Sequence, residues 1–228
     1  MVIGHLETPT ETIHIEGKHV AGGDYEPGTL LAAYRAGLFI STGRDGSIGW
    51  LSPGPRFIMT MDRIHISNSL RRARNRFITK INAAFVEVVE ACADRKEGEY
   101  QWLVPEVRQA VGRLHQLGWA HSVEAWTLES EEEPSKLVGG LYGIAIGGLF
   151  CGESMFSRQR DASKVAFAAL VGVLKGDGRD AEGRLIDVQM RTPHLASLGA
   201  YDVSREEYME RLKRALKLPL PAVFNPQG

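Results

Sequence analysis

A carboxylate and an amide stand two positions apart near the C-terminal end of the sequence, in the otherwise apolar run 185–190. If this run is a β-strand, Asp187 and Gln189 share one face of it, and Ile186 lies on the other. Polar groups on such a strand are costly to bury unless partners engage them. The pair therefore indicates either a functional site or two side chains that satisfy neighbouring backbone groups.

A third candidate is Glu153, which follows an apolar run and precedes Ser154. A carboxylate in this position can bind a cationic ligand, and the alternative is a solvated glutamate at the end of a strand. A metal site is not expected, because His115 and His121 fit no helical ligand motif. The two cysteines of the chain also match no zinc or redox spacing.

The basic residues are unevenly distributed, although the net charge of the whole chain is only −1. Residues 63–80 contain no aspartate or glutamate and include Arg63, Arg71, Arg72, Arg74, Arg76 and Lys80. A cluster of this kind can bind the phosphates of a nucleic acid, and the alternative is an ordinary solvated surface.

The elements that must position these residues follow from periodicity. Helices are expected at 29–37, 67–76, 83–94, 105–117, 161–175 and 204–216, and strands at 77–81, 121–128, 137–146, 149–156 and 185–190. Gly147 and Gly148 between two apolar runs predict a hairpin, and Ser204 with Glu207 predicts a capped helix start. We expect an α+β protein with a mixed sheet, divided into a small N-terminal domain at 1–62 and a larger domain at 63–228.

Neither export nor membrane insertion is expected. The first 16 residues lack the basic start and apolar run of a secretory signal. The longest apolar stretch, 137–151, is interrupted by five glycines and is too short to span a bilayer. These features favour a cytoplasmic location.

Long phrases of the sequence occur in a recognisable order. They are AYRAGLF at 33–39, LSPGPR at 51–56, the run LVGGLYGIAIGGLFCGESMFS at 137–157, DASK at 161–164 and IDVQ at 186–189. This set resembles the leucyl/phenylalanyl-tRNA–protein transferase family over roughly residues 29 to 210. Two departures stand out, because Ile40-Ser41 replaces the usual Pro-Trp and Trp50-Leu51 replaces a Trp-Trp pair. A contact of these aromatic positions with the 3′ adenosine of a tRNA is therefore in question.

The resemblance implies a C-terminal domain with the N-acetyltransferase (GNAT) fold, and a reaction that needs neither a metal nor coenzyme A. Its implied reaction moves leucine, phenylalanine or methionine from an aminoacyl-tRNA to the N-terminal Arg or Lys of an acceptor protein. That transfer would mark the acceptor for degradation under the N-end rule, and we expect the enzyme to be a monomer. The alternatives are a tRNA-binding homologue with altered donor choice or without catalysis, and a coenzyme A-dependent N-acetyltransferase. The last would need a glycine-rich pyrophosphate loop, which is not evident after Phe156.

The resemblance also suggests roles for individual residues. Gln189 would orient the attacking amine, Asp187 would position that amide or act as a base, and Glu153 would bind the cationic acceptor. The candidates for an apolar donor pocket are Tyr142, Ile144, Met155, Phe156 and Ile186. Trp102 would stack on the terminal adenine. The residues expected to bind the tRNA backbone are Arg71, Arg72, Arg74, Arg76 and Lys80.

Overall fold

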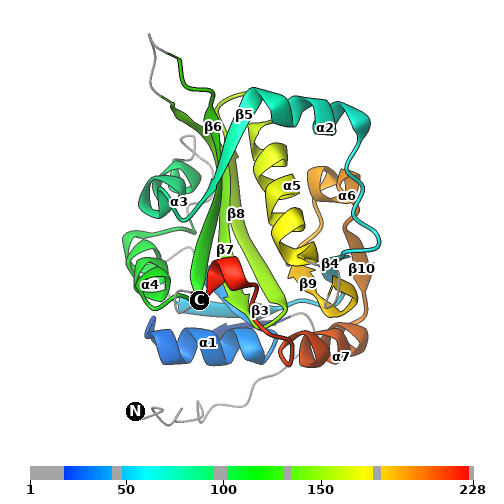
Figure 1. Cartoon of the computed structure of the whole chain (residues 1–228). Coiled ribbons are helices and arrows are strands. Elements are labelled where there is room, and N and C mark those ends of the chain that lie inside the picture. The colour runs from blue at the N-terminus through cyan, green and yellow to red at the C-terminus, as the bar shows by residue number, and fades with distance from the viewer. Residues whose placement is uncertain (1–17, 43–47, 95–101, 131–134, 177–180, 226–228) are drawn as a thin grey trace.

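The computed structural model describes residues 18–42, 48–94, 102–130, 135–176 and 181–225. In these parts the chain forms two β-sheets, with helices packed around the larger one (Figure 1). The strands are β1 (Lys18–Ala21), β2 (Phe39–Thr42), β3 (Ile48–Ser52), β4 (Arg56–Thr60), β5 (Phe77–Ile81), β6 (Ala120–Thr127), β7 (Leu137–Ile146), β8 (Leu149–Ser157), β9 (Leu185–Asp187) and β10 (Tyr201–Val203). The α-helices are α1 (Pro27–Arg35), α2 (Asn68–Ala73), α3 (Phe85–Ala93), α4 (Pro105–Gln116), α5 (Ala162–Lys175), α6 (Pro193–Ser197) and α7 (Arg205–Ala215). Short 3-10 turns lie at Arg74–Arg76, Ala181–Gly183 and Ala222–Phe224.

The larger sheet has seven strands in the order β10-β4-β9-β8-β7-β6-β5. Neighbouring strands are antiparallel except β8 and β9, which run parallel, so the sheet is mixed. The predicted α+β class with a mixed sheet is confirmed. The smaller sheet, β1-β3-β2, is built from strands that precede β4, whereas β4 itself pairs with β9 and β10. The division into two domains at residue 62 stays a prediction.

Helices cover both faces of the larger sheet and create two apolar cores. Figure 1 shows α3 and α4 on one side of the long strands and α5 and α6 on the other. The first core contains Val88 of α3 and Val107 of α4, and the second contains Val165 of α5. Because side chains alternate along β7, Ile144 enters the first core and Leu141 the second. Strands β7 and β8 are therefore apolar on both faces.

The hairpin between β7 and β8 forms at the predicted position. Gly147 has a φ of 61°, in the left-handed region that favours glycine. A Cβ atom at Gly147 would lie 2.8 Å from the carbonyl oxygen of Leu218, so the C-terminal segment packs directly against this turn. The turn therefore needs glycine for both its conformation and its close contact.

The two segments that depart from the family phrases, 40–41 and 50–51, lie in strands β2 and β3 of the small sheet. Ile40 and Trp50 face each other across β2 and β3, and both are buried. The Trp50 indole Nε1 donates a hydrogen bond to the carbonyl oxygen of Gly22 at 2.9 Å. Trp50 is thus a core residue of this sheet, and its ring is not free to stack on an adenine.

The strand predicted at 185–190 is shorter than expected, which corrects one sequence inference. It ends at Asp187, and Gln189 adopts a left-handed conformation with a φ of 67°. The Asp187 carboxylate turns back and accepts a hydrogen bond from the Gln189 backbone N–H at 2.9 Å. Aspartate is well suited to such local turns, because its short side chain can bond the backbone two residues ahead. Asp187 and Gln189 are therefore joined through a turn, and not through one face of a strand.

The parallel strands β8 and β9 pair over only three residues and then separate. The last pair joins Cys151 to Asp187, after which β8 continues to Ser157 paired only with β7. On the other side of β8 the register shifts, so that Gly152 faces Gly143 while Glu153 has no partner on β7. Glu153 is thus the extra residue of a β-bulge, a device that redirects a side chain. The separation and the bulge together create the candidate active site.

Candidate active site

A buried ion pair forms the centre of the site. The Arg56 guanidinium on β4 contacts Asp187 through Nε–Oδ1 at 2.9 Å and Nη2–Oδ2 at 2.6 Å. Both side chains are at most 1% exposed. The guanidinium also lies against the rings of Phe39 and Tyr208, 4.6 Å and 4.5 Å from their centroids. The arginine is therefore held on several sides, and it fixes the carboxylate in a bidentate geometry.

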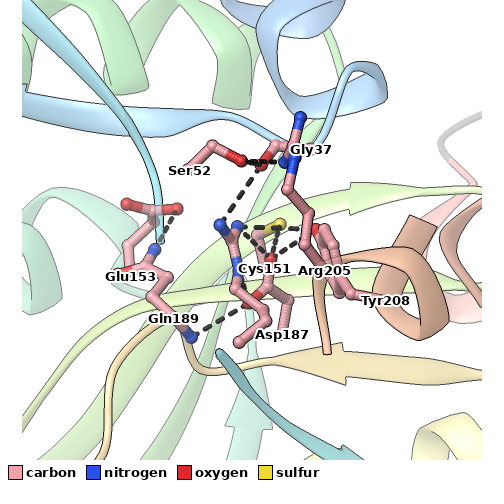
Figure 2. A network of polar contacts seen from close by, with 9 residues as sticks. Gly37, Ser52, Cys151, Glu153, Asp187, Gln189, Arg205 and Tyr208 are labelled. Atoms are coloured by element: carbon pink, nitrogen blue, oxygen red, sulfur yellow. Dashed lines mark hydrogen bonds and ion pairs between the residues drawn. The ribbon is translucent and has the colours of Figure 1, made fainter. Parts of the chain in front are cut away.

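Asp187 is enclosed by further donors (Figure 2). The Tyr208 hydroxyl donates to Oδ2 at 2.7 Å, and the Cys151 thiol contacts the same oxygen at 3.7 Å. Burial, together with the Asp187 charge, raises the pKa of Tyr208 and of Cys151 well above their usual ranges, so both remain protonated donors. With 0% of its surface exposed, Asp187 is enclosed by protein groups. A role of this carboxylate in positioning Gln189 stays a prediction.

Glu153 and Gln189 bridge the separated strands. The Gln189 Nε2 donates to the Glu153 carboxylate at 3.2 Å, as Figure 2 shows, and the Tyr34 hydroxyl forms a second hydrogen bond with Glu153. Burial raises the pKa of Glu153 to about 7, and the nearby Asp187 adds to the rise, while the bonds from Tyr34 and Gln189 oppose it. Glu153 therefore changes charge near neutral pH, where it can receive or release a proton.

This pKa predicts how stability depends on pH. The folded-state pKa of about 7 lies above the ordinary value of 4.5, so ionised Glu153 destabilises the fold. That cost is small below the ordinary value, grows as pH rises and is complete above pH 7. Relative to wild type, Glu153→Gln should gain about 2 kcal/mol of unfolding free energy between pH 5 and pH 8. Urea denaturation at the two pH values measures this gain, and an equal effect of the substitution at both would contradict it.

An apolar pocket of about 300 Å³ opens beside Glu153 and Gln189. Its walls come from β8, from β9 and the segment after it, and from α5 and α6. The pocket is lined by Leu141, Phe150, Gly152, Glu153, Ser154, Met155, Phe167, Leu170, Ile186, Val188, Gln189, Met190, Thr192 and Leu195. A small apolar group can thus be enclosed while a polar group attached to it stays at the rim beside the carboxylate and the amide.

The structure brings only some of the predicted donor-pocket residues together. Met155 and Ile186 line this pocket. Tyr142 and Ile144 are buried in the first core, on the opposite face of the sheet, and Phe156 and Trp102 pack against that same core. Periodicity could not separate the two groups, because both faces of β7 and β8 are apolar. Tyr142, Ile144 and Phe156 therefore do not line this pocket, and Trp102, which was expected to stack on an adenine, lies on the first-core side of the sheet.

The basic cluster is exposed on one end of the molecule. Arg71 and Arg72 lie on α2, Arg74 and Arg76 on the 3-10 turn that follows it, and Lys80 on the edge strand β5. The Arg76 guanidinium contacts Asp161, just before α5, at 2.8 Å. The cluster therefore continues onto the segment that leads from β8 to α5. Within it, Lys80 lies over the Trp126 ring at 4.6 Å.

Three members of the site were missed by reasoning from the sequence. Arg56, Tyr34 and Tyr208 contact Asp187 or Glu153 but lie far from them along the chain. Arg56 ends the phrase at 51–56, and Tyr34 stands within the phrase at 33–39. Those phrases were the available signal, whereas Tyr208 lies in a helix whose pattern indicates only an amphipathic surface.

Fold and site define a class: an α+β protein in which a carboxylate and an amide stand at the rim of a pocket for a small apolar group. The family model described as leucyl/phenylalanyl-tRNA protein transferase matches residues 58–213. The chain belongs to this family of transferases.

Curated relatives agree with the family model, and each is named leucyl/phenylalanyl-tRNA–protein transferase. The protein of Anaeromyxobacter sp. (strain Fw109-5) is 46% identical over 90% of this chain and 84% of its own length. The protein of Magnetococcus marinus is 40% identical over 94% of this chain and 90% of its own length. The protein of Edwardsiella ictaluri is 42% identical over 97% of this chain and 94% of its own length. Among solved structures, L-PGS from Bacillus licheniformis is similar with a TM-score of 0.34 and 14% identity, covering 82% of this chain and 62% of that one. A similarity this low supports no conclusion about the fold.

No helix among the described residues is long and apolar enough to cross a membrane. In the same part of the chain, no group of three or more His, Cys, Asp or Glu residues could hold a metal ion.

Proposed function

We propose that the chain transfers leucine or phenylalanine from aminoacyl-tRNA to the N-terminal Arg or Lys of acceptor proteins. The observation that carries this proposal is the apolar pocket with Glu153 and Gln189 at its rim, in a chain 40–46% identical to the transferases of Anaeromyxobacter and Magnetococcus. A pocket of this kind accepts an apolar side chain that is unbranched at Cβ, as in leucine and phenylalanine, and leaves the attached ester at the polar rim.

Gln189 orients the attacking amine in this proposal. Its Nε2 is held by Glu153, and its backbone N–H is held by Asp187. The side-chain Oε1 makes no hydrogen bond with a residue that the structure describes, so it is available to accept one from an amine N–H. A neutral amide is a poor proton acceptor, so Gln189 positions the nucleophile and does not deprotonate it.

The chemical step forms a C–N bond between the α-amine and the ester carbonyl carbon and breaks the C–O bond to the ribose. The proton of the amine passes to water or to the leaving ribose oxygen. An α-amine has an ordinary pKa of about 8 and is therefore partly neutral at physiological pH. No strong base is needed, which fits a site whose Asp187 is enclosed.

Glu153 binds the cationic acceptor. It is a buried residue that lines the pocket and, above pH 7, places a negative charge there. A buried carboxylate attracts an Arg or Lys side chain more strongly than an exposed one, because water screens it less. Acceptors with a neutral first residue lack this contact.

One assay tests the proposed function. Wild-type protein is incubated with radiolabelled leucyl-tRNA and peptides that begin with Arg, Lys or Ala, and acetyl-CoA serves as the alternative donor. We expect transfer to the Arg and Lys peptides only, and reduced preference for them in Glu153→Gln. Acetylation of the peptides, or tRNA binding without any transfer, would replace the proposal by one of its two alternatives.

We expect the preference for one donor amino acid over another to depend on the β8 side chains that face the pocket, and not on those that face the first core. Met155→Ala widens the pocket by removing a lining side chain, whereas Phe156→Ala removes a neighbour that faces the other core. We expect Met155→Ala to improve kcat/KM for a tryptophanyl donor relative to a leucyl donor by about tenfold, because one or two methylene equivalents carry that much discrimination. Phe156→Ala should leave the ratio unchanged. Competition between tryptophanyl-tRNA and leucyl-tRNA measures this ratio of kcat/KM values. An equal change of the ratio in both variants would show that the donor side chain does not bind in this pocket.

The basic cluster binds the tRNA backbone in this proposal. Arg71 and Arg72 are exposed, so their charges are available to phosphates. The double substitution Arg71→Ala with Arg72→Ala should weaken tRNA binding and reduce the slope of log K against log salt by about 2. The same change at exposed Lys213 and Arg214 of α7 is the matched control. Filter binding at several salt concentrations measures these slopes. Equal slopes in the two double variants would exclude the basic cluster as the tRNA-binding surface.

The same proposal extends to the domain division, a further donor amino acid, the oligomeric state and the cellular location. Strands β5 to β10 of the larger sheet would belong to a GNAT-like domain at 63–228, with 1–62 as a small N-terminal domain that contributes β4 to the same sheet. The mixed sheet, with its one parallel pair β8–β9 beside the pocket, supports this comparison. We also propose methionine as a further donor, a monomeric enzyme and a cytoplasmic location.

A further inference from the structure

Met190 stands at the opening of the apolar pocket. The residue lines the pocket, yet it is 55% exposed to solvent. The structure describes four other methionines, of which Met59 and Met61 are buried and Met155 and Met209 are partly buried. Met190 is thus the described methionine that reagents in solution reach most easily, and it lies where solvent and pocket meet.

The backbone around Met190 is held in place, so the freedom at this position belongs to its side chain. The Met190 N–H donates a hydrogen bond to the carbonyl oxygen of Val188 at 2.8 Å. The next residue, Arg191, forms an ion pair with Asp202 and lies over the Phe57 ring, 5.0 Å from its centroid. A methionine side chain has three rotatable bonds and a polarisable thioether, so it adapts to groups of different shape. From this position Met190 can close over an apolar group in the pocket.

An exposed thioether is also open to oxidation by hydroperoxides. A lone pair of the sulfur attacks one oxygen of hydrogen peroxide, the S–O bond forms, and the O–O bond breaks. The proton of the transferred hydroxyl passes to the leaving hydroxide, so that the sulfur is oxidised to a sulfoxide and the peroxide is reduced to water. An apolar, flexible side chain thereby becomes a polar one.

We propose that Met190 is a site of oxidative modification, and that its sulfoxide weakens binding of the donor amino acid in the apolar pocket. This inference rests on the proposed function, because it takes the pocket as the site of the leucyl or phenylalanyl side chain.

The expected loss follows from the surroundings of the sulfoxide oxygen. A donor side chain that fills the pocket displaces water from the groups at its opening, and an acceptor that loses its water without a new partner is costly. Most of the side chains that line the pocket are apolar and offer no hydrogen-bond donor. The nearest amide, the Nε2 of Gln189, is already bonded to Glu153. The unmodified thioether carries no such cost.

Peroxide treatment followed by transfer assays tests the site. Wild type is treated with hydrogen peroxide, catalase removes the excess, and peptide mass spectrometry follows each methionine. Sulfoxide should form at Met190 before it forms at Met155 or Met209. Leucyl transfer to an Arg-initiated peptide should then show a donor KM raised about tenfold with kcat unchanged, because the loss concerns donor binding and not the chemical step. Methionine sulfoxide reductases should restore the original KM.

Two variants separate Met190 from other oxidised groups. Met190→Leu replaces the thioether by a hydrocarbon of similar volume that peroxide does not oxidise. The donor KM of this variant, whatever its value, should be the same before and after peroxide. Met209→Leu is the matched control, because it removes a partly buried methionine of α7 that does not line the pocket. It should respond to peroxide as wild type does. Recovery with the reductases excludes the buried thiols of Cys92 and Cys151 as the cause.

Three results would overturn the proposal while transfer by untreated wild type upholds the proposed function. They are faster oxidation at Met155 or Met209, a donor KM that oxidation of Met190 does not raise or that the reductases do not restore, and an equal effect of peroxide on Met190→Leu. If untreated wild type transfers no leucine, the proposed function fails and this inference fails with it.

Discussion

Replacing Asp187 by asparagine should abolish transfer and lower the free energy of unfolding by about 3–5 kcal/mol. The substitution keeps the shape of the side chain but removes its charge, and Arg56 is left as a buried cation that is 1% exposed. A buried charge without its partner carries most of its desolvation cost uncompensated. The turn that holds Gln189 also loses the carboxylate that anchors its backbone N–H. Urea denaturation and the leucyl-transfer assay measure the two effects.

The control for this prediction is a second ion pair on the surface. Arg191 pairs with Asp202, and the two side chains are 60% and 33% exposed. Asp202→Asn should cost no more than about 1 kcal/mol, because water screens an exposed pair and its partner is readily solvated. Comparable losses in the two variants would show that burial of the Arg56–Asp187 pair does not set its contribution.

A triple substitution separates the contribution of Asp187 to stability from its contribution to transfer. Arg56→Met, Asp187→Leu and Tyr208→Phe together replace the buried charges and the hydroxyl that bonds them by apolar groups. Such replacements often restore the stability that removing one partner costs. We expect part of the stability to return, while transfer stays lost because the anchor of Gln189 is absent. A stable and active triple variant would remove Asp187 from its positioning role.

Replacing Gln189 by alanine should lower kcat by about 100-fold, with little change in donor KM or in stability. Alanine and glutamine pay a similar cost for the φ of 67° at this position, so the backbone is not the cause of the loss. What disappears is the amide that Glu153 holds and that would accept the amine N–H. Single-turnover transfer at saturating leucyl-tRNA measures the effect.

Gln189→Asn tests whether the reach of the amide matters. Asparagine keeps the amide and adopts left-handed backbone readily, but it is one methylene shorter. Its nitrogen would lose the 3.2 Å contact with Glu153, so we expect a loss of kcat similar to that in Gln189→Ala. Near-normal turnover in either variant at saturating donor would exclude Gln189 from the mechanism.

The sequence by itself determined the features that depend on neighbours along the chain. Glycines at 147 and 148 specify the β7–β8 turn, and Ser204 caps α7 through a hydrogen bond from the Glu207 N–H, because each of these needs only local backbone geometry. The spacing of apolar residues likewise located α4 and α5. The α+β class followed from these local signals, and the long family phrases identified the chain.

Only the tertiary structure decided how the site is assembled. Arg56 lies 131 positions from Asp187, and no local pattern relates two residues that meet through the pairing of β4 with β9. Alternation also could not assign Ile144 and Met155 to different compartments, because a strand buried on both faces is apolar at every position and carries no sign of which core each side chain enters. The end of β9 at Asp187 and the bulge at Glu153 likewise depend on hydrogen bonds to other segments, and these bonds exist only in the folded chain.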